Sequence, residues 1–245
     1  MSENESCLVS KLSNYIDLDQ TDFDFLTTLE EEEEDFPPRH VVRAAGEESD
    51  YLYVVKSGWL FSDIELVDGR RQVVQVYNAG DIIGMPDIAL HRSALNLHSI
   101  TDVVLCPFPK QHLDKIITGS KRLSALLFTL SLRDQVIFTD KLRTLGRMNA
   151  RERIAWFLLD IVHRLRITNR TMTDTFRLPM NQTEIGDAMG LTSVTVSKTM
   201  MQLQLDKLID RRGGKIILCD ENALREMCDY IDRYRDMDTS WFPEA

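Results

Sequence analysis

A helix–glycine–helix pattern in the C-terminal third of the chain constrains the fold more tightly than any other stretch. Asn181, followed three residues later by Glu184, has the spacing of a capping box, which predicts that a helix begins directly after Asn181. Gly190 tolerates the left-handed backbone of a tight turn, so this helix is expected to end there. A second helix then begins with Thr192 or Ser193 as its N-cap. The stretch therefore predicts two short helices joined by a glycine turn.

The side chains of these two helices divide into an inward and an outward set. Gly186 is small where the second helix is expected to cross the first. We expect four apolar side chains to face inward and hold the angle: Ile185, Met189, Leu191 and Val196. The outward residues are mostly small or hydrogen-bonding, which suits contact with base edges and phosphates in a DNA groove. We predict DNA contacts from Gln182, Thr183, Thr192, Ser193, Val194, Thr195, Ser197, Lys198, Gln202 and Arg212.

A basic hairpin and a basic block of sequence accompany this pattern. Arg211–Lys215 precedes the short apolar run Ile216–Leu218, which predicts the wing of a winged helix with its own phosphate contact. Residues 141–215 hold 14 Lys and Arg but only 7 Asp and Glu, whereas the whole chain has a net charge of −10. A basic block within an acidic chain is typical of a segment that meets a polyanion.

The first half of the chain has a different character. Its first 35 residues predict one or two short helices that end in the acidic run Glu30–Asp35, which we interpret as solvated charge. From Val41 to Phe108, short β-branched and aromatic runs alternate with turn signals, a pattern that predicts an antiparallel sandwich or barrel. Asp68-Gly69 lies between two such runs and is expected at a hairpin tip.

Helical periodicity returns after residue 109 and continues to about residue 145. A short helix comes first, and the longer one behind it has two apolar stripes. One stripe is Leu123, Leu126, Leu127, Leu130 and Ile137; the other is Phe128, Leu132 and Val136. The second stripe is compatible with contact to a partner chain and equally with burial in a monomer core, so the sequence leaves both interpretations open.

The order of these parts resembles the catabolite-activator and fumarate-nitrate-regulator (CRP/FNR) superfamily of bacterial transcription factors. The resemblance spans about residues 10–235 and rests on Leu52–Gly58, Gly80–Gly84, Arg151–Ala155 and Asn181–Lys198. It implies an α+β fold with an N-terminal antiparallel β-roll like the jelly roll of cyclic-nucleotide-binding domains. A long dimerisation helix and a C-terminal winged helix-turn-helix would follow.

The resemblance also implies a domain organisation and a set of partners. The N-terminal helices and β-roll effector domain would span residues 1–109, the dimerisation helix 110–146 and the winged helix-turn-helix domain 147–245. A homodimer would bind a two-fold-symmetric promoter site on double-stranded DNA, with half-sites about one helical turn apart, and would contact RNA polymerase. The acidic N-terminus and the short apolar runs predict a cytoplasmic protein with no membrane partner.

Two positions of the predicted recognition helix depart from the family pattern. Val194 and Lys198 stand where the family members with the best-known site preferences carry Glu and Arg. Val194 cannot accept a hydrogen bond from cytosine but can pack on a thymine methyl, and Lys198 lacks the fork of Arg. We therefore expect a DNA site that differs from the familiar half-sites.

The cofactors of the family are not expected here. The iron–sulfur branch needs a group of N-terminal cysteines, and only Cys7 lies there, while Cys106 is expected to be a buried thiol. The spacing of His91, His98 and His112 fits neither a metal nor a haem site, so we expect no metal.

An anionic effector is the one ligand for which the sequence offers candidate residues. Arg92 and Ser93 resemble the pair that grips the cyclic phosphate in the cyclic AMP branch. Met85, however, stands where that branch has the Glu that grips the ribose, so cyclic AMP itself is not expected. Arg92 and Ser93 are therefore the candidate ligand-binding residues.

Two other classes of function compete with that of a DNA-binding regulator. The first is a module that binds an anionic, nucleotide-like small molecule and uses its winged helix for protein contacts. The second is a β-barrel enzyme, against which the sequence shows no phosphate-binding loop, dinucleotide fingerprint, zinc-protease motif or nucleophile elbow. We therefore expect a regulator that is not an enzyme.

Overall fold

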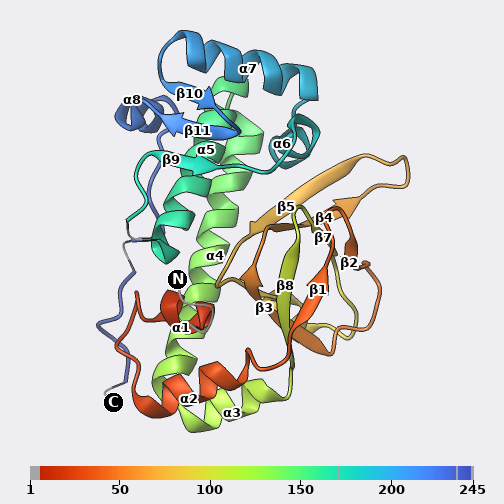
Figure 1. Ribbon diagram of the computed structural model, residues 1–245, viewed down its shortest axis with the longest axis vertical. Coiled ribbons are helices and arrows are strands. Elements are labelled where there is room, and N and C mark those ends of the chain that lie inside the picture. The colour runs from red at the N-terminus through yellow and green to blue at the C-terminus, as the bar shows by residue number, and fades with distance from the viewer. Residues whose placement is uncertain (1–5, 170, 236, 244–245) are drawn as a thin grey trace. The chain divides into compact units, whose positions relative to one another are not determined.

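The computed structural model describes residues 6–169, 171–235 and 237–243 (Figure 1), so the acidic residues 1–5 lie outside the described part. The chain divides into two compact units. The β-roll unit comprises Met1–Gly69, Val74–Arg133 and Met237–Ala245, and the helix-turn-helix unit comprises Arg70–Val73 and Asp134–Asp236. The division of the chain into functional segments 1–109, 110–146 and 147–245 stays a prediction, because the two units are defined by compactness and not by function.

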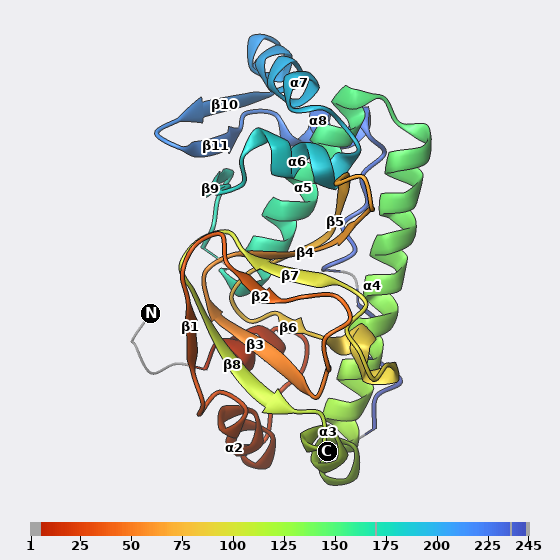
Figure 2. The same ribbon diagram turned by 90° about the vertical axis from the view of Figure 1, so that its right-hand side faces the viewer.

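The β-roll unit contains two four-stranded antiparallel sheets, whose strands are seen in Figure 2. One sheet has the strand order β1-β8-β3-β6 and the other β2-β7-β4-β5. This arrangement confirms the predicted antiparallel β-roll. The strands are β1 (Glu34–Phe36), β2 (Val41–Arg43), β3 (Tyr51–Ser57), β4 (Leu60–Glu65), β5 (Arg71–Tyr77), β6 (Ile82–Ile83), β7 (Asn96–Ser99) and β8 (Val103–Pro109).

Two short helices precede the sheets, as the periodicity predicts: α1 (Cys7–Leu12) and α2 (Gln20–Thr28). The acidic run that follows α2 is not simply solvated charge, which corrects the interpretation from the sequence. Glu30 is only 8% exposed, and its carboxylate accepts hydrogen bonds from the backbone N–H groups of Cys7 (3.2 Å) and Leu8 (2.7 Å). Its side chain thus satisfies two N–H groups in the first turn of α1 that have no partner within the helix.

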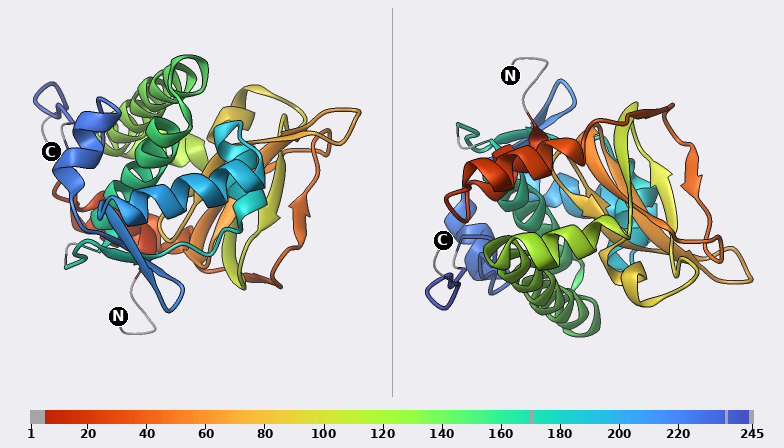
Figure 3. Two further views of the ribbon diagram at one scale, coloured as in Figure 1. Left: turned by 90° about the horizontal axis from the view of Figure 1, so that it is seen from above. Right: turned by 90° about the horizontal axis from the view of Figure 1, so that it is seen from below.

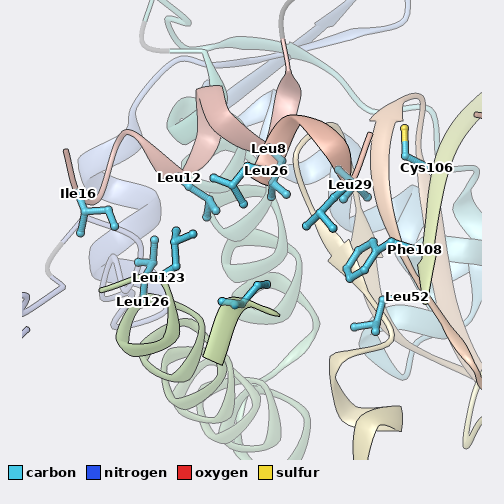
Figure 4. Packing of buried hydrophobic residues seen from close by; sticks show 12 residues of the cluster. Leu8, Leu12, Ile16, Leu26, Leu29, Leu52, Cys106, Phe108, Leu123 and Leu126 are labelled. Atoms are coloured by element: carbon cyan, nitrogen blue, oxygen red, sulfur yellow. The ribbon is translucent and has the colours of Figure 1, made fainter. Parts of the chain in front are cut away.

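The core of the β-roll unit lies between these helices and the β3–β8 pair (Figure 4). Leu8 and Leu12 of α1, Leu52 of β3 and Phe108 of β8 are at most 2% exposed, and α4 adds further leucines. Because burying each such side chain contributes about 1.5–3 kcal/mol, this cluster accounts for much of the unit's stability. A buried ion pair between Lys11 and Asp81 joins α1 to the loop before β6.

Two helices follow the last strand of the β-roll: α3 (His112–Gly119) and α4 (Lys121–Arg147). The two predicted apolar stripes of α4 have different environments. Leu123 and Leu126 are buried, whereas Phe128, Leu132 and Val136 are exposed. The second stripe is therefore not buried within this chain.

The helix-turn-helix unit is built around the long helix α5 (Ala150–Thr168), which begins with a complete capping box between Asn149 and Glu152. Its buried side chains run nearly without interruption from Ile154 to Leu159, so neighbouring elements pack on several of its faces. The remaining elements are β9 (Thr175–Arg177), α6 (Gln182–Met189), α7 (Ser193–Leu205), β10 (Ile209–Arg212), β11 (Lys215–Leu218) and α8 (Glu221–Met227). None of the helices in the described ranges has the length and apolar character needed to cross a membrane.

A partly buried cluster of charged side chains around the buried His163 joins α8 and the chain after it to α5. The ring of His163 lies between two carboxylates, with Nε2 3.0 Å from Glu221 Oε1 and Nδ1 2.7 Å from Asp232 Oδ2. Arg166 Nη2 lies 2.9 Å from Glu221 Oε2, and Arg225 Nε donates to Oε1 at 3.1 Å. Burial alone would raise the pKa of Glu221, but the hydrogen bond and charge of Arg166, aided by His163 and Arg225, lower it to about 2.

This cluster predicts an acid-sensitive contribution to stability. A carboxylate whose folded pKa lies below its unfolded value of about 4.3 stabilises the fold above that pH and loses its effect as the pH falls toward 2. The urea midpoint of the wild-type protein should therefore fall between pH 5 and pH 2.5 more steeply than that of Glu221→Gln. Parallel midpoints for the two proteins across this range would contradict the assigned role of Glu221.

Candidate nucleic-acid interface

Helices α6 and α7 form the predicted helix-turn-helix, and each has the predicted cap. Asn181 Oδ1 accepts from the N–H groups of Thr183 (2.9 Å) and Glu184 (3.0 Å), while Glu184 Oε2 accepts from the N–H of Asn181 (2.7 Å). Gly190 ends α6 in the left-handed region, with φ +63°. Thr192 caps α7 by accepting from Thr195 N–H at 3.2 Å. These bonds confirm the helix boundaries read from the sequence.

Gly186 fits this motif because the turn runs directly over it. A Cβ atom at position 186 would stand 2.4 Å from the carbonyl oxygen of Leu191, closer than real Cβ contacts come. The predicted inward residues Ile185, Met189 and Val196 are buried as expected, whereas Leu191 is only half-buried. The small residue thus lets the turn lie close against α6 and fixes how α7 leaves it.

A side chain of α5 that the sequence analysis did not single out also holds the turn. Arg153 Nη1 donates to the carbonyl of Met189 at 3.1 Å and lies 3.4 Å from that of Gly190. Its Nε donates to the carbonyl of Met148 at 2.9 Å. Arg153 lies within the motif Arg151–Ala155 that carries the family resemblance. This motif was the sequence feature from which its importance could have been predicted.

The predicted contact residues of α7 lie on its solvent face. Val194 is 60% exposed, Lys198 and Gln202 are exposed, and their spacing of four residues aligns them along the helix. Thr192 is also exposed at the N-terminus of the motif, whereas Ser193, Thr195 and Ser197 are half-buried beside this face. The face opposite is buried through Val196, Thr199, Met200 and Leu203. Figure 3 (left) shows α7 from above with the hairpin β10–β11 beside it.

The hairpin β10–β11 is the predicted wing. Gly213 and Gly214 form its two-residue loop with φ of +57° and +74°, the pair of positive values that a tight hairpin turn of this kind requires. An open groove of about 1020 Å³ separates the wing from α6 and α7. Four predicted contact residues line it, namely Gln182, Thr183, Ser193 and Arg212. The structure therefore gathers predicted residues from three elements around one groove.

Polar contacts fix the wing to the end of α7. Gln204 Nε2 donates to Asp210 Oδ1 at 3.2 Å, and Arg211 Nε donates to Gln204 Oε1 at 3.3 Å. Arg212 Nε lies 2.5 Å from Asp210 Oδ2, although its side chain is largely exposed. Gln204, Arg211 and Lys215 also line the groove or its rim and were not among the predicted contacts. The basic sequence of the wing could have predicted Arg211 and Lys215 as contact residues. The position of Gln204 beside the groove is apparent only from the folded hairpin.

The two candidate ligand residues of the β-roll unit have different surroundings. The exposed Arg92 donates from Nη1 to the carbonyl of Gly46 at 2.6 Å. Ser93 is buried, and its Oγ lies 3.2 Å from the carboxylate of Asp87. Cys106 is buried as predicted, and burial raises the pKa of its thiol to about 12. Within the described residues, no group of three or more His, Cys, Asp and Glu could hold a metal ion.

Each unit contains a segment that matches a known protein family. Residues 33–120 match the cyclic nucleotide-binding domain and residues 152–227 the Crp-like helix-turn-helix domain. The chain is 32% identical over 194 residues to the nitrogen fixation regulation protein FixK of Rhizobium meliloti (strain 1021), covering 79% of this chain and 85% of that protein. It is 32% identical over 185 residues to a probable transcriptional activator of Rhizobium leguminosarum bv. viciae, covering 75% and 76%. The chain belongs to the CRP/FNR superfamily of transcription regulators.

A solved structure supports the same assignment at the level of the fold. The structure of FixK2 from Bradyrhizobium japonicum matches this CRP/FNR regulator with a TM-score of 0.73 at 27% identity, covering 80% of this chain and 96% of that one. The predicted fold class is thereby confirmed. Like its relatives, this CRP/FNR regulator is a DNA-binding regulator of transcription that uses a helix-turn-helix domain.

The close contact at Gly186 leads to a direct test of the motif. Gly186→Ala should destabilise this CRP/FNR regulator by about 1–3 kcal/mol, because the added methyl group collides with the backbone of the turn. Urea unfolding measures the change. The matched control is Gly146→Ala in α4, where an added Cβ meets no atom within 4 Å; it should be neutral or stabilising by up to about 1 kcal/mol. Equal effects of the two substitutions would show that the turn does not need Gly186.

Proposed function

We propose that this CRP/FNR regulator binds a two-fold-symmetric site on double-stranded DNA as a homodimer, with α7 in the major groove and the wing against the phosphates. The observation that carries the proposal is the solvent face of α7, whose outward residues stand beside a basic hairpin in one unit. A recognition helix that reads bases needs such a face, and flanking phosphate contacts fix its register on the duplex.

The side chains of this face indicate what kind of site it would read. Val194 is exposed without a hydrogen-bonding group, so packing on a thymine methyl is the base contact open to it. Lys198 follows one turn later and would contact guanine or a phosphate as a point charge. Ser197 and Gln202, before and after Lys198 in the helix, would supply hydrogen bonds to the duplex. These residues support a half-site that differs from those of family members with Glu and Arg at positions 194 and 198.

The wing would supply sequence-independent affinity. Arg211, Arg212 and Lys215 are exposed around the Gly213–Gly214 turn. Arg212 already pairs with Asp210 at 2.5 Å on the surface, where an ion pair contributes little, so exchanging that carboxylate for a phosphate costs little free energy. Binding should consequently weaken steeply with salt, because each phosphate contact releases counterions from DNA.

Removal of Lys198 tests the recognition helix. A site is first selected from random DNA with the wild-type protein, and affinities are then measured on this site and on scrambled duplexes. Lys198→Ala should weaken binding to the selected site by about 1–3 kcal/mol if Lys198 reads a base, and almost equally on all duplexes if it contacts only phosphate. Lys115→Ala, which removes an exposed lysine from α3 in the β-roll unit, is the matched control and should leave the affinity unchanged.

Three results would contradict this part of the proposal. Equal affinity of the wild type and Lys198→Ala for the selected site would remove Lys198 from the interface. Selection of a familiar catabolite-activator or fumarate-nitrate half-site would show that Val194 and Lys198 do not alter the site. Binding that does not depend on salt would argue instead for a winged helix that contacts protein.

The homodimer is supported by the exposed face of α4. Five large apolar side chains are exposed on this helix, and at 100° per residue they fall within an arc of about 160°. They are Phe128, Leu132, Val136, Phe138 and Leu142, the last of which is 72% exposed. A contiguous apolar stripe of this length on a helix surface is typical of a helix–helix interface. A second copy of the chain, related by two-fold symmetry, would bring the same stripe against it.

Charged substitutions in the stripe test the dimer. Phe128→Glu combined with Leu142→Glu should convert a dimer to a monomer at micromolar concentration, as measured by sedimentation equilibrium, because two pairs of carboxylates would be buried in the interface. Ile117→Glu on α3 is the control, since it replaces an equally exposed apolar residue outside the stripe. A dimer that survives the double substitution would show that α4 is not the interface.

The remaining parts of the proposal follow from the relatives. These are bacterial transcription regulators, so we infer a cytoplasmic location, RNA polymerase as a further partner, and no enzymatic activity. Cys7, Cys106 and Cys228 are buried and Cys219 is exposed, and the described residues include no group of three or more His, Cys, Asp and Glu that could hold a metal ion. We accordingly propose regulation without an iron–sulfur cluster, haem or cyclic AMP.

A further inference from the structure

The β-roll unit contains a buried carboxylate that is surrounded by hydrogen-bond donors. Asp87, in the short helix η1 (Met85–Ala89), is 4% exposed. Its Oδ2 accepts from Arg43 Nη2 at 2.6 Å and lies 3.2 Å from Ser93 Oγ, and its Oδ1 accepts from the backbone N–H of Ala94 at 3.2 Å. The single proton of Ser93 is shared with the carbonyl of Leu95, 2.8 Å away. Three donors, one from strand β2 and two from the loop before β7, therefore converge on one anionic group.

The donors are held by backbone pairing that does not involve Asp87. Ser93 N–H donates to the carbonyl of Glu47 at 2.9 Å, and Gly46 N–H donates to that of Ser93 at 2.8 Å. Arg43 is 7% exposed and comes from the end of β2, where its Nη1 lies 3.4 Å from the carbonyl of Tyr51. Because these segments are fixed to each other, we expect the donors to keep their positions when the carboxylate is removed.

This set of donors is more than an ordinary ion pair requires. A guanidinium, a hydroxyl and a backbone N–H together form the arrangement by which proteins hold carboxylate and phosphate oxygens. Arg43 Nε is buried and has no hydrogen-bond partner among the described residues, so the guanidinium retains donor capacity. The group bound there must be anionic, since an unpaired buried Arg43 would be costly.

We propose that Arg43, Ser93 and the Ala94 N–H form an anion-binding cradle that the chain fills with its own Asp87 carboxylate. The carboxylate occupies the place that the acidic group of a small ligand would otherwise take. The predicted ligand pair is thereby divided: Ser93 belongs to the cradle, whereas Arg92 is engaged with Gly46 outside it. With its anion supplied internally, the β-roll unit packs without a bound effector, and it accepts a small oxyanion only when Asp87 is withdrawn.

Anion rescue of a variant tests this proposal on the full chain. Asp87→Ala should lower the Tm by about 6–15 °C, because Arg43 loses its buried partner. Sodium formate, which has the size of the missing carboxylate, should raise the Tm of this variant with the logarithm of its concentration up to about 100 mM. Sodium chloride at equal ionic strength should not. The wild-type Tm should respond equally weakly to formate, inorganic phosphate and chloride.

A double variant provides the control for site specificity. Arg43→Met combined with Asp87→Ala removes the principal donor, so formate should no longer stabilise the protein. Should Asp87→Ala fail to fold, Asp87→Ser keeps an acceptor for Arg43 and leaves most of the carboxylate's volume open to formate. The proposal is overturned if formate stabilises neither Asp87 variant, if it stabilises the double variant as strongly, or if the wild type shows saturable stabilisation by phosphate.

Discussion

The angle at which α7 leaves α6 depends on the contact between Gly186 and the carbonyl of Leu191. Everything that the recognition helix presents to solvent depends on that angle, since a rotation of α7 would bury Lys198 or expose Val196. Three further restraints act on the same turn: the Thr192 cap of α7, the left-handed Gly190 and the hydrogen bonds from Arg153. A short helix is marginal by itself, so these backbone restraints and the packing on α5 keep α7 in one orientation.

Charge is distributed between the units in a way that suits a DNA-binding regulator. Some basic residues of the segment 141–215 are neutralised by carboxylates, as in the ion pairs of Arg151 with Asp206 and of Arg166 with Glu221. The cations of this segment that remain exposed include Lys198 on α7 and Arg211, Arg212 and Lys215 of the wing, where phosphates would lie. The acidic residues of the β-roll unit repel the DNA phosphates, so that DNA does not bind to this unit. Net charge alone would have argued against this function.

Inside the β-roll unit, buried charges are consistently matched by specific partners. Lys11 pairs with Asp81, Arg43 with Asp87, and Glu30 with the first N–H groups of α1. Each pair joins segments that are distant in sequence, and removal of one partner would leave a buried charge. Such pairs are directional, so they define the positions of the loops on the sheets more precisely than apolar packing alone does. The pair of Arg43 with Asp87 has a second consequence, because the Asp87 carboxylate occupies hydrogen-bond donors that could otherwise bind the anionic group of a ligand.

The amino-acid sequence by itself determined the local parts of this protein. Helix boundaries at Asn181 and Gly190, the wing at Gly213–Gly214 and the first apolar stripe of α4 follow from capping, backbone freedom and periodicity, all of which act within a few residues. That stripe is buried at Leu123 and Leu126 and half-buried further along the helix. The short strands β1, β2, β6, β7 and β9 were not predicted individually, because strands of two to four residues carry too little pattern. Only the tertiary structure revealed that Glu30 caps α1, that Arg153 holds the turn and that Asp87 lies among the donors of Arg43 and Ser93. These contacts join residues between 6 and 44 positions apart, some brought together by strand pairing and some by helix packing, and no local rule reports such proximity.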